Sequence, residues 1–209
     1  MDDENYFNYY RRFGVEIELN SLDKRDFKLY PLKPGEMPAG IYEIGLMVSE
    51  LFPNNKINFK TWHPVHNNDA WVLKPDSSCG IELCTPVLRF NQDLNIVHKA
   101  ITEIKNKYYD LVDDRCSFHV HVDVSDLSEM EITAVLAYWI KCEAVFMDSV
   151  PLHRKKNRYC MMIGSLDIFQ HDTMVSFDLL VKKLGLQKYF TLNTFHYNRN
   201  NRKLSLIHI

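Results

Sequence analysis

The sequence predicts an α+β fold with a mostly antiparallel sheet and helices packed on one face of that sheet. Several segments alternate apolar and polar residues with a period of two, which is typical of strands, and others repeat apolar residues at helical spacing. The expected order is strand, helix, hairpin, helix, strand, helix, helix, with no regular βαβ alternation. A chain of 209 residues that is 46% hydrophobic can bury one core, so we expect a single domain over residues 1–209.

The first half of the chain supplies two motif strands of this sheet. In order, we expect a strand at 13–19, a polar, proline-bearing loop at 20–40, a helix at 41–52, an irregular segment at 54–68, a hairpin of strands 70–74 and 80–88, and a helix at 93–111. Pro53 ends the first helix because proline cannot continue it. The hairpin turns through Pro75, Asp76, Ser77 and Ser78, which are turn-forming residue types.

The second half begins with the strand at 116–124. Ser128 and Glu131 then have the spacing of a capping box, and an apolar stripe at helical spacing follows until Pro151. A basic loop, PLHRKKNRYC, is expected at 151–160, and a helix at 172–184 that Gly185 caps. The remainder, 189–209, is largely polar.

The strand at 116–124, CSFHVHVDV, places His119, His121 and Asp123 on one face and apolar residues on the other. Side chains two residues apart on a strand are separated by about 6.6 Å, so these groups form a rigid row. The strand at 13–19 likewise has Glu16 and Glu18 on one face, and Glu82 lies opposite apolar neighbours in GIELCT. Each strand alone is compatible with an ordinary polar face turned to water.

A metal site follows if the three strands are neighbours. Glu16, Glu18 and Glu82 then lie close together, and each like-charged pair at 4 Å costs about 4 kcal/mol at an effective dielectric constant of 20. A counter-cation relieves this repulsion. Carboxylate oxygens with one or two imidazoles favour Mg²⁺ or Mn²⁺ over zinc, which prefers nitrogen and sulfur.

Composition argues against several classes of protein. The 25 Lys plus Arg residues nearly balance the 27 Asp plus Glu, so no basic surface for nucleic acid or a membrane is predicted. The five cysteines are odd in number and form no CxxC pair, which is typical of reduced intracellular thiols. The N-terminal segment has no apolar stretch typical of a signal peptide, and no run of ~18 apolar residues occurs. We therefore expect a soluble, cytoplasmic protein.

Four motifs in one order resemble the amidoligases, carboxylate–amine ligases related in fold to glutamine synthetase and glutamate–cysteine ligase. The motifs are FGVEIEL at 13–19, WVLKPDSSCGIELCTPVL at 71–88, CSFHVHVDVSDLS at 116–128 and PLHRKKNRYC at 151–160. The resemblance implies a glutamine synthetase-like sheet that binds ATP and Mg²⁺ or Mn²⁺. It also implies that a small-molecule or peptide carboxylate is activated as an acyl phosphate and captured by an amine.

The resemblance also implies roles for individual residues. The metal ligands are Glu16, Glu18, Glu82 and His119; the nucleotide- or phosphate-binding residues are His119, His121, Arg154 and Asp76; and the catalytic residues are Arg154 and Asn157. For Arg154 the alternative is a solvated run of basic residues. For Asp76 the alternative is a turn residue with no ligand role.

The sequence departs from the family pattern near its end. The family continues after Leu192 and Asn193 into a strand with a Glu and an Arg, whereas this chain continues NRNNRKLSLIHI. The closing LSLIHI resembles translated sequencing-adapter sequence. We therefore expect the chain to be truncated at its C-terminus.

Two other function classes are compatible with the motifs. HVHVD is similar to the HxHxD of metal-dependent hydrolases, although those usually place another His where this chain has Val124, and the paired glutamates would then have no role. A catalytically inactive nucleotide- or peptide-binding module is the other alternative. Mg²⁺-dependent ATP turnover separates the ligase from both.

Overall fold

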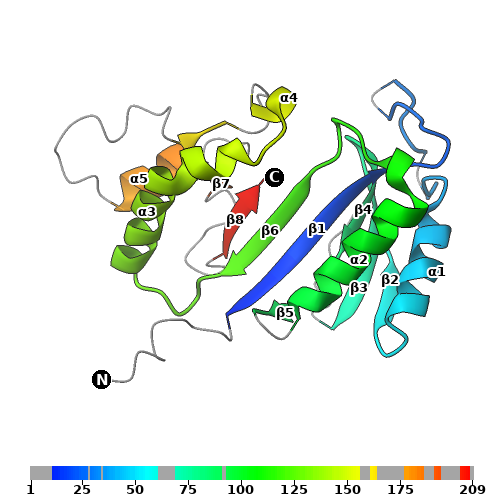
Figure 1. Cartoon of the computed structure of the whole chain (residues 1–209), viewed down its shortest axis with the longest axis horizontal. Helices are drawn as coiled ribbons and strands as arrows, with labels where there is room; N and C mark the ends of the chain where they lie inside the picture. The colour runs from blue at the N-terminus through cyan, green and yellow to red at the C-terminus, as the bar shows by residue number, and fades with distance from the viewer. Residues whose placement is uncertain are drawn as a thin grey trace. The chain divides into compact units, whose positions relative to one another are not determined.

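The computed structural model divides the chain into two compact units, residues 1–118 and 119–209, and each unit is described by itself. The structure describes residues 11–27, 29–33, 35–60, 69–90, 93–155, 161–163, 177–185, 191–193 and 203–207. Figure 1 shows both helices and strands, as an α+β protein requires. The assignment of residues 1–209 to a single domain stays a prediction.

Among its described residues, the first unit contains a sheet, two α-helices and one short 3₁₀ helix. Its elements are β1 (Arg12–Asn20), α1 (Ile41–Leu51), β2 (Lys56–Phe59), β3 (Ala70–Asp76), β4 (Gly80–Cys84), β5 (Leu88–Arg89), α2 (Leu94–Lys107) and the 3₁₀ helix η2 (Tyr109–Leu111). The strands lie in the order β2-β3-β4-β1, and β5 pairs with the start of β1. The predicted hairpin is present as β3 and β4, and α1 ends just before Pro53 as predicted.

The sheet of the first unit is mixed, because it contains one parallel pair of strands. One strand of this pair lies within residues 54–68, which we expected to be irregular, so that expectation is corrected. The segment expected to be irregular contains β2, which runs parallel to β3, whereas the pairs β3–β4, β1–β4 and β1–β5 are antiparallel. The Phe59 ring of β2 packs on α1. Its centroid lies 4.9 Å from that of Tyr42, and a Cβ added at Gly45 would come within 2.4 Å of the ring. Packing against α1 therefore stabilises β2, which is too short to show a clear alternation of polar and apolar residues.

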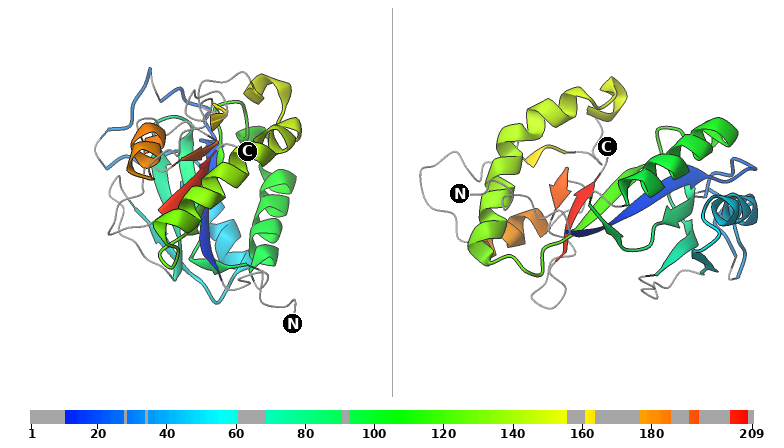
Figure 2. Two further views of the ribbon diagram at one scale, coloured as in Figure 1. Left: turned by 90° about the vertical axis from the view of Figure 1, so that its left-hand side faces the viewer. Right: turned by 60° about the horizontal axis from the view of Figure 1, so that its bottom comes forward.

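Both helices of the first unit cover the apolar face of its sheet. The Phe52 ring at the end of α1 stacks on Trp71 of β3 with centroids 5.1 Å apart, and Trp71 is fully buried. Lys99 of α2 donates to the carbonyl of Leu51 at 3.2 Å, so α2 lies beside α1, as Figures 1 and 2 show. The side chains that alternate with Trp71 along β3, including Lys74, therefore lie on the opposite, polar face.

The second unit begins in β6 (Phe118–Asp123). Its other elements are α3 (Glu129–Asp148), α4 (Leu152–Lys155), α5 (Phe177–Gly185), β7 (Leu192–Asn193) and β8 (Lys203–Ile207). Strand β8 pairs antiparallel with both β6 and β7. The predicted capping box is present: the Ser128 hydroxyl accepts from the Glu131 N–H at 3.3 Å, and the Glu131 carboxylate accepts from the Ser128 N–H at 2.7 Å.

The second unit has its own core between α3, α5 and the strand ends. It consists of the buried apolar residues Val124, Ile132, Leu136, Ile163, Leu180 and Leu192. The Glu143 carboxylate is also fully buried, and it accepts hydrogen bonds from the Ile163 N–H at 2.8 Å and from the Thr191 hydroxyl. Because a buried polar group is costly unless it is hydrogen-bonded, these two contacts of Glu143 connect α3 to two separate segments of this unit.

One expectation for the second unit changes. The start of the basic stretch is the short helix α4, because the Arg154 and Lys155 N–H groups both donate to the carbonyl of Pro151, at 2.8 and 3.2 Å. The helix expected from residue 172 is described only from Phe177, since residues 164–176 lie outside the described part of the chain. Among the described residues, no helix is long and apolar enough to cross a membrane.

Candidate metal centre

The polar face of the first unit gathers charged side chains from three adjacent strands. In the antiparallel register, Glu18 of β1 faces Glu82 of β4, and Glu82 also faces Lys74 of β3. One step along, Glu16 faces Cys84. Directly opposed residues in an antiparallel pair point to the same side of the sheet. The register therefore brings together five polar side chains, which we call the carboxylate cluster: Glu16, Glu18, Lys74, Glu82 and Cys84.

Glu82 is the centre of the hydrogen bonds within the carboxylate cluster. Its Oε1 accepts from the Lys74 ammonium at 2.7 Å and from the Cys84 thiol at 3.2 Å. One ligand-type atom from each of Glu16, Glu82 and Cys84 lies within 4.8 Å of the other two. This spacing allows all three to contact one metal ion.

The environment of Glu82 disfavours its charged form. Burial, together with the nearby negative charge of Glu16, raises the pKa of Glu82 to about 7, although Lys74 acts in the opposite direction. Burial alone would lower the pKa of Lys74, but the carboxylate of Glu82 raises it overall. Burial and the carboxylates of Glu82 and Glu16 raise the pKa of the Cys84 thiol. A cation at this point is thus strongly favoured, and Lys74 supplies one.

Glu18 of the carboxylate cluster is hydrogen-bonded to the residue just before β6 (Phe118–Asp123), the strand that carries His119 and His121. Its backbone N–H donates to the carbonyl of Ser117 at 3.0 Å, and Ser117 immediately precedes β6. The Glu18 side chain is buried. The predicted neighbours β1 and β4 are therefore present, and β1 is also joined to the residue that leads into the third motif strand.

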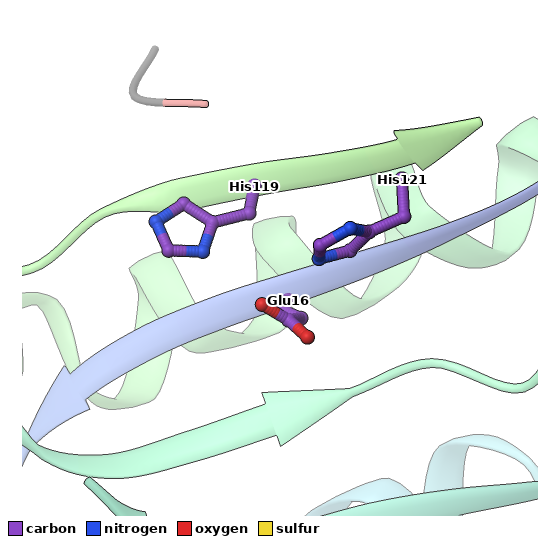
Figure 3. Close-up of side chains that lie close together, drawn as sticks. All are labelled: Glu16, His119 and His121. Carbon is purple, nitrogen blue, oxygen red and sulfur yellow. The ribbon is translucent and has the colours of Figure 1, made fainter. Parts of the chain in front are cut away.

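His119 and His121 alternate along β6 with Val120 and Val122. Val122 packs against the core of the second unit, so the histidines occupy the other face of the strand. Figure 3 shows the imidazoles of His119 and His121 projecting from β6 and the carboxylate of Glu16 from β1.

Asp76 organises the turn between β3 and β4. Its Oδ1 accepts from the backbone N–H groups of Ser78 at 2.6 Å and Cys79 at 3.2 Å, and also from the Ser78 hydroxyl. Burial opposes the charge, but these hydrogen bonds lower the pKa of Asp76 overall. Gly80 completes the turn with φ of 128°, where a Cβ would lie 2.6 Å from the Phe27 ring. The turn accounts for Asp76, and its contact with nucleotide stays a prediction.

Arg154 lies on α4 and is half-buried. Its neighbour Lys155 forms an ion pair with Asp148 at 3.2 Å. Asn157 lies outside the described residues. The roles predicted for Arg154 and Asn157 therefore stay predictions.

The sequence reasoning missed Lys74 and Cys84 as members of the carboxylate cluster. The signal was present: in AWVLKPD, Lys74 alternates with the apolar Trp71, Leu73 and Pro75. In GIELC, Cys84 is two residues from Glu82 and so shares its face. Both follow from the period-two rule that identified the glutamates.

Comparison with known proteins identifies the family. A family model described as "Putative amidoligase enzyme" matches residues 54–173, which is more than half of the 209-residue chain. The matched range contains three of the four motifs, and only FGVEIEL at 13–19 precedes it. No similar protein was found among curated sequences or among solved structures. On the strength of the family match, the chain belongs to the amidoligase family.

Proposed function

We propose that the protein is an ATP- and divalent-metal-dependent ligase that joins a carboxylate to an amine through an acyl phosphate. Membership of the amidoligase family supports the reaction class. The observation that carries the metal dependence is the position of Glu16 and Glu82, whose ligand-type atoms lie within 4.8 Å of each other beside Lys74. Carboxylates so close on a half-buried sheet face require compensating positive charge.

The donor set fits a hard divalent cation. Glu16 and Glu82 offer carboxylate oxygens, and Glu18 lies directly opposite Glu82. We expect His119 to add an imidazole nitrogen. Oxygen-rich sites with one or two imidazoles suit Mg²⁺ or Mn²⁺. When bound, such an ion neutralises the charge of the triphosphate and orients it. His121 and Arg154 are the residues that we expect to contact nucleotide or phosphate.

The reaction proceeds in two balanced steps. First, a carboxylate oxygen of the substrate bonds to the γ-phosphorus of ATP and the bond to ADP breaks, which leaves an acyl phosphate and ADP. Second, the amine nitrogen bonds to the acyl carbon, inorganic phosphate leaves, and the nitrogen gives up a proton to water. Phosphoryl transfer depends mainly on positioning and on stabilising moving charge. A guanidinium such as that of Arg154 can hold the transferred phosphate through paired hydrogen bonds.

A trapping assay tests this proposal. The protein is incubated with Mg²⁺, ATP, hydroxylamine and each common amino acid in turn, and ADP and acyl hydroxamate are both measured. The ligase predicts hydroxamate equal in amount to the ADP released with at least one carboxylate, and none with Glu16→Gln. ADP release without hydroxamate would contradict it and favour hydrolysis, and nucleotide binding without turnover would favour an inactive binding module.

A further inference from the structure

We propose that Lys74 is an exchangeable counter-cation of the carboxylate cluster. Its ammonium pairs with Glu82 while no metal is bound, a divalent ion displaces it from Glu82, and the released ammonium then holds the anionic ligand at that ion. This inference rests on the proposed function and assigns a positioning residue to it. None of the metal-binding, nucleotide-binding or catalytic residues predicted from the sequence has this counter-cation role.

Lys74 contacts one of the two oxygens through which Glu82 could bind a metal ion. Its Nζ lies 2.7 Å from Oε1 of Glu82, the same oxygen that accepts from the Cys84 thiol. Glu82 and Glu16 are also within the spacing that allows one ion to contact both. An ion that bound Glu82 at this oxygen would take the place of the ammonium.

Charge explains why the exchange is favourable. Lys74 contributes one positive charge, whereas Glu16, Glu18 and Glu82 offer three carboxylates on the same face of the sheet. A divalent ion brings twice the charge of an ammonium and can bind two of these carboxylates at once. Lysine suits exchange because its charge sits on a flexible four-carbon chain, so the ammonium can move without a change in the backbone.

The released ammonium has a defined use. The Lys74 side chain is 26% exposed and that of Glu82 9%, so the lysine lies at the open side of the pair. An ammonium is a compact cation that binds phosphate as a point charge. The phosphate groups of a nucleotide held by the metal ion would therefore replace Glu82 as the partner of Lys74.

The first experiment measures Mn²⁺ binding from the electron paramagnetic resonance signal of the free ion. We compare wild type, Lys74→Gln, Lys74→Arg and the control Lys107→Gln. The control removes another lysine–glutamate pair, since Lys107 lies 2.9 Å from Glu103 on the exposed face of α2. Lys74→Gln should bind Mn²⁺ ~10-fold more tightly, which corresponds to ~1.4 kcal/mol. It should also bind ATP ~10-fold more weakly once Mn²⁺ is bound, whereas Lys107→Gln and Lys74→Arg should match wild type in Mn²⁺ affinity.

The second experiment needs no variant and so does not depend on the folding of Lys74→Gln. Wild type is acetylated briefly with an amine-reactive ester, and mass spectrometry compares Lys74 with Lys107. Mg²⁺ should increase the labelling of Lys74 several-fold, ATP added with Mg²⁺ should decrease it again, and Lys107 should not change.

The outcomes separate this inference from the proposed function. If wild type binds Mn²⁺ but Lys74→Gln binds it no more tightly, or if Mg²⁺ leaves the labelling of Lys74 unchanged, the exchange is wrong and the metal site stands. If neither wild type nor Lys74→Gln binds Mn²⁺, the metal site and the exchange both fail.

Discussion

Glu18 and Glu82 face each other across the antiparallel strands β1 and β4, and each is only 7% exposed. Like charges directly opposite each other on a sheet are destabilising, and burial increases the cost. An apolar pair at these positions would make a more stable sheet. The metal site that we propose would account for this arrangement, because a bound cation offsets the repulsion between the two carboxylates.

We expect Mg²⁺ or Mn²⁺ to stabilise the protein, because the ion relieves the repulsion within the carboxylate cluster and binds only the folded state. Binding at a hundredfold excess over Kd adds about 2.7 kcal/mol to the free energy of unfolding. Thermal melting with and without the ion checks this, with Glu16→Gln as the variant that should respond less. Equal melting temperatures in all conditions would count against a metal site.

The stability of the metal-free protein should fall as pH rises from about 4.5 to about 7. The pKa of Glu82 is raised from 4.5 to about 7 in the folded state, so the folded protein holds the proton more tightly than the unfolded chain. The stabilisation from this proton is complete below the unfolded pKa and is lost as pH rises through the folded pKa. Lys74 remains protonated throughout this range and contributes no slope.

Urea unfolding in the presence of a chelator measures this dependence. Glu82→Gln should flatten the curve over this range, since the titrating group is gone. Glu103→Gln on α2, which lies outside the carboxylate cluster, should keep the slope of wild type. A slope in Glu82→Gln equal to that of wild type would assign the effect to other groups.

Arg154→Lys should weaken the binding of ATP with Mg²⁺, because a guanidinium can hold phosphate through paired hydrogen bonds and an ammonium cannot. Loss of one charged hydrogen-bonded contact corresponds to about 1.5 to 3 kcal/mol. The neighbouring Lys155→Ala should have little effect, since its exposed ion pair with Asp148 resembles pairs that contribute ~0–1 kcal/mol. Isothermal titration of both variants decides the matter, and equal, small losses would assign α4 to the solvated surface.

Ser128→Ala should lower the free energy of unfolding by about 0.5 to 2 kcal/mol, because it removes the hydroxyl that accepts from the Glu131 N–H at the start of α3. Metal affinity should not change, since Ser128 belongs to no part of the carboxylate cluster. Urea unfolding and Mn²⁺ titration of the same sample would show this separation. A loss of Mn²⁺ affinity in this variant would mean that α3 positions the metal ligands.

The period-two pattern predicted most of the candidate site. It correctly placed Glu16 and Glu18 on the face opposite Val15, Ile17 and Leu19, which are buried. The hairpin register, which depends on the turn around Asp76 and Gly80, decides that Glu82 faces Lys74. The separate pairing of β1 with β4 decides that Glu82 faces Glu18, and no strand pattern alone contains either register. The strand β2 was missed because it is only four residues long and is held by contacts of Phe59 with α1.

An anomalous-scattering map from crystals grown with Mn²⁺ tests most directly whether Glu16 and Glu82 bind one divalent ion. We expect a Mn²⁺ peak within coordination distance of carboxylate oxygens of both residues, with the Lys74 ammonium moved away from Glu82. A peak that contacts neither carboxylate, or the absence of any peak at saturating Mn²⁺ with the Lys74–Glu82 pair intact, would contradict it.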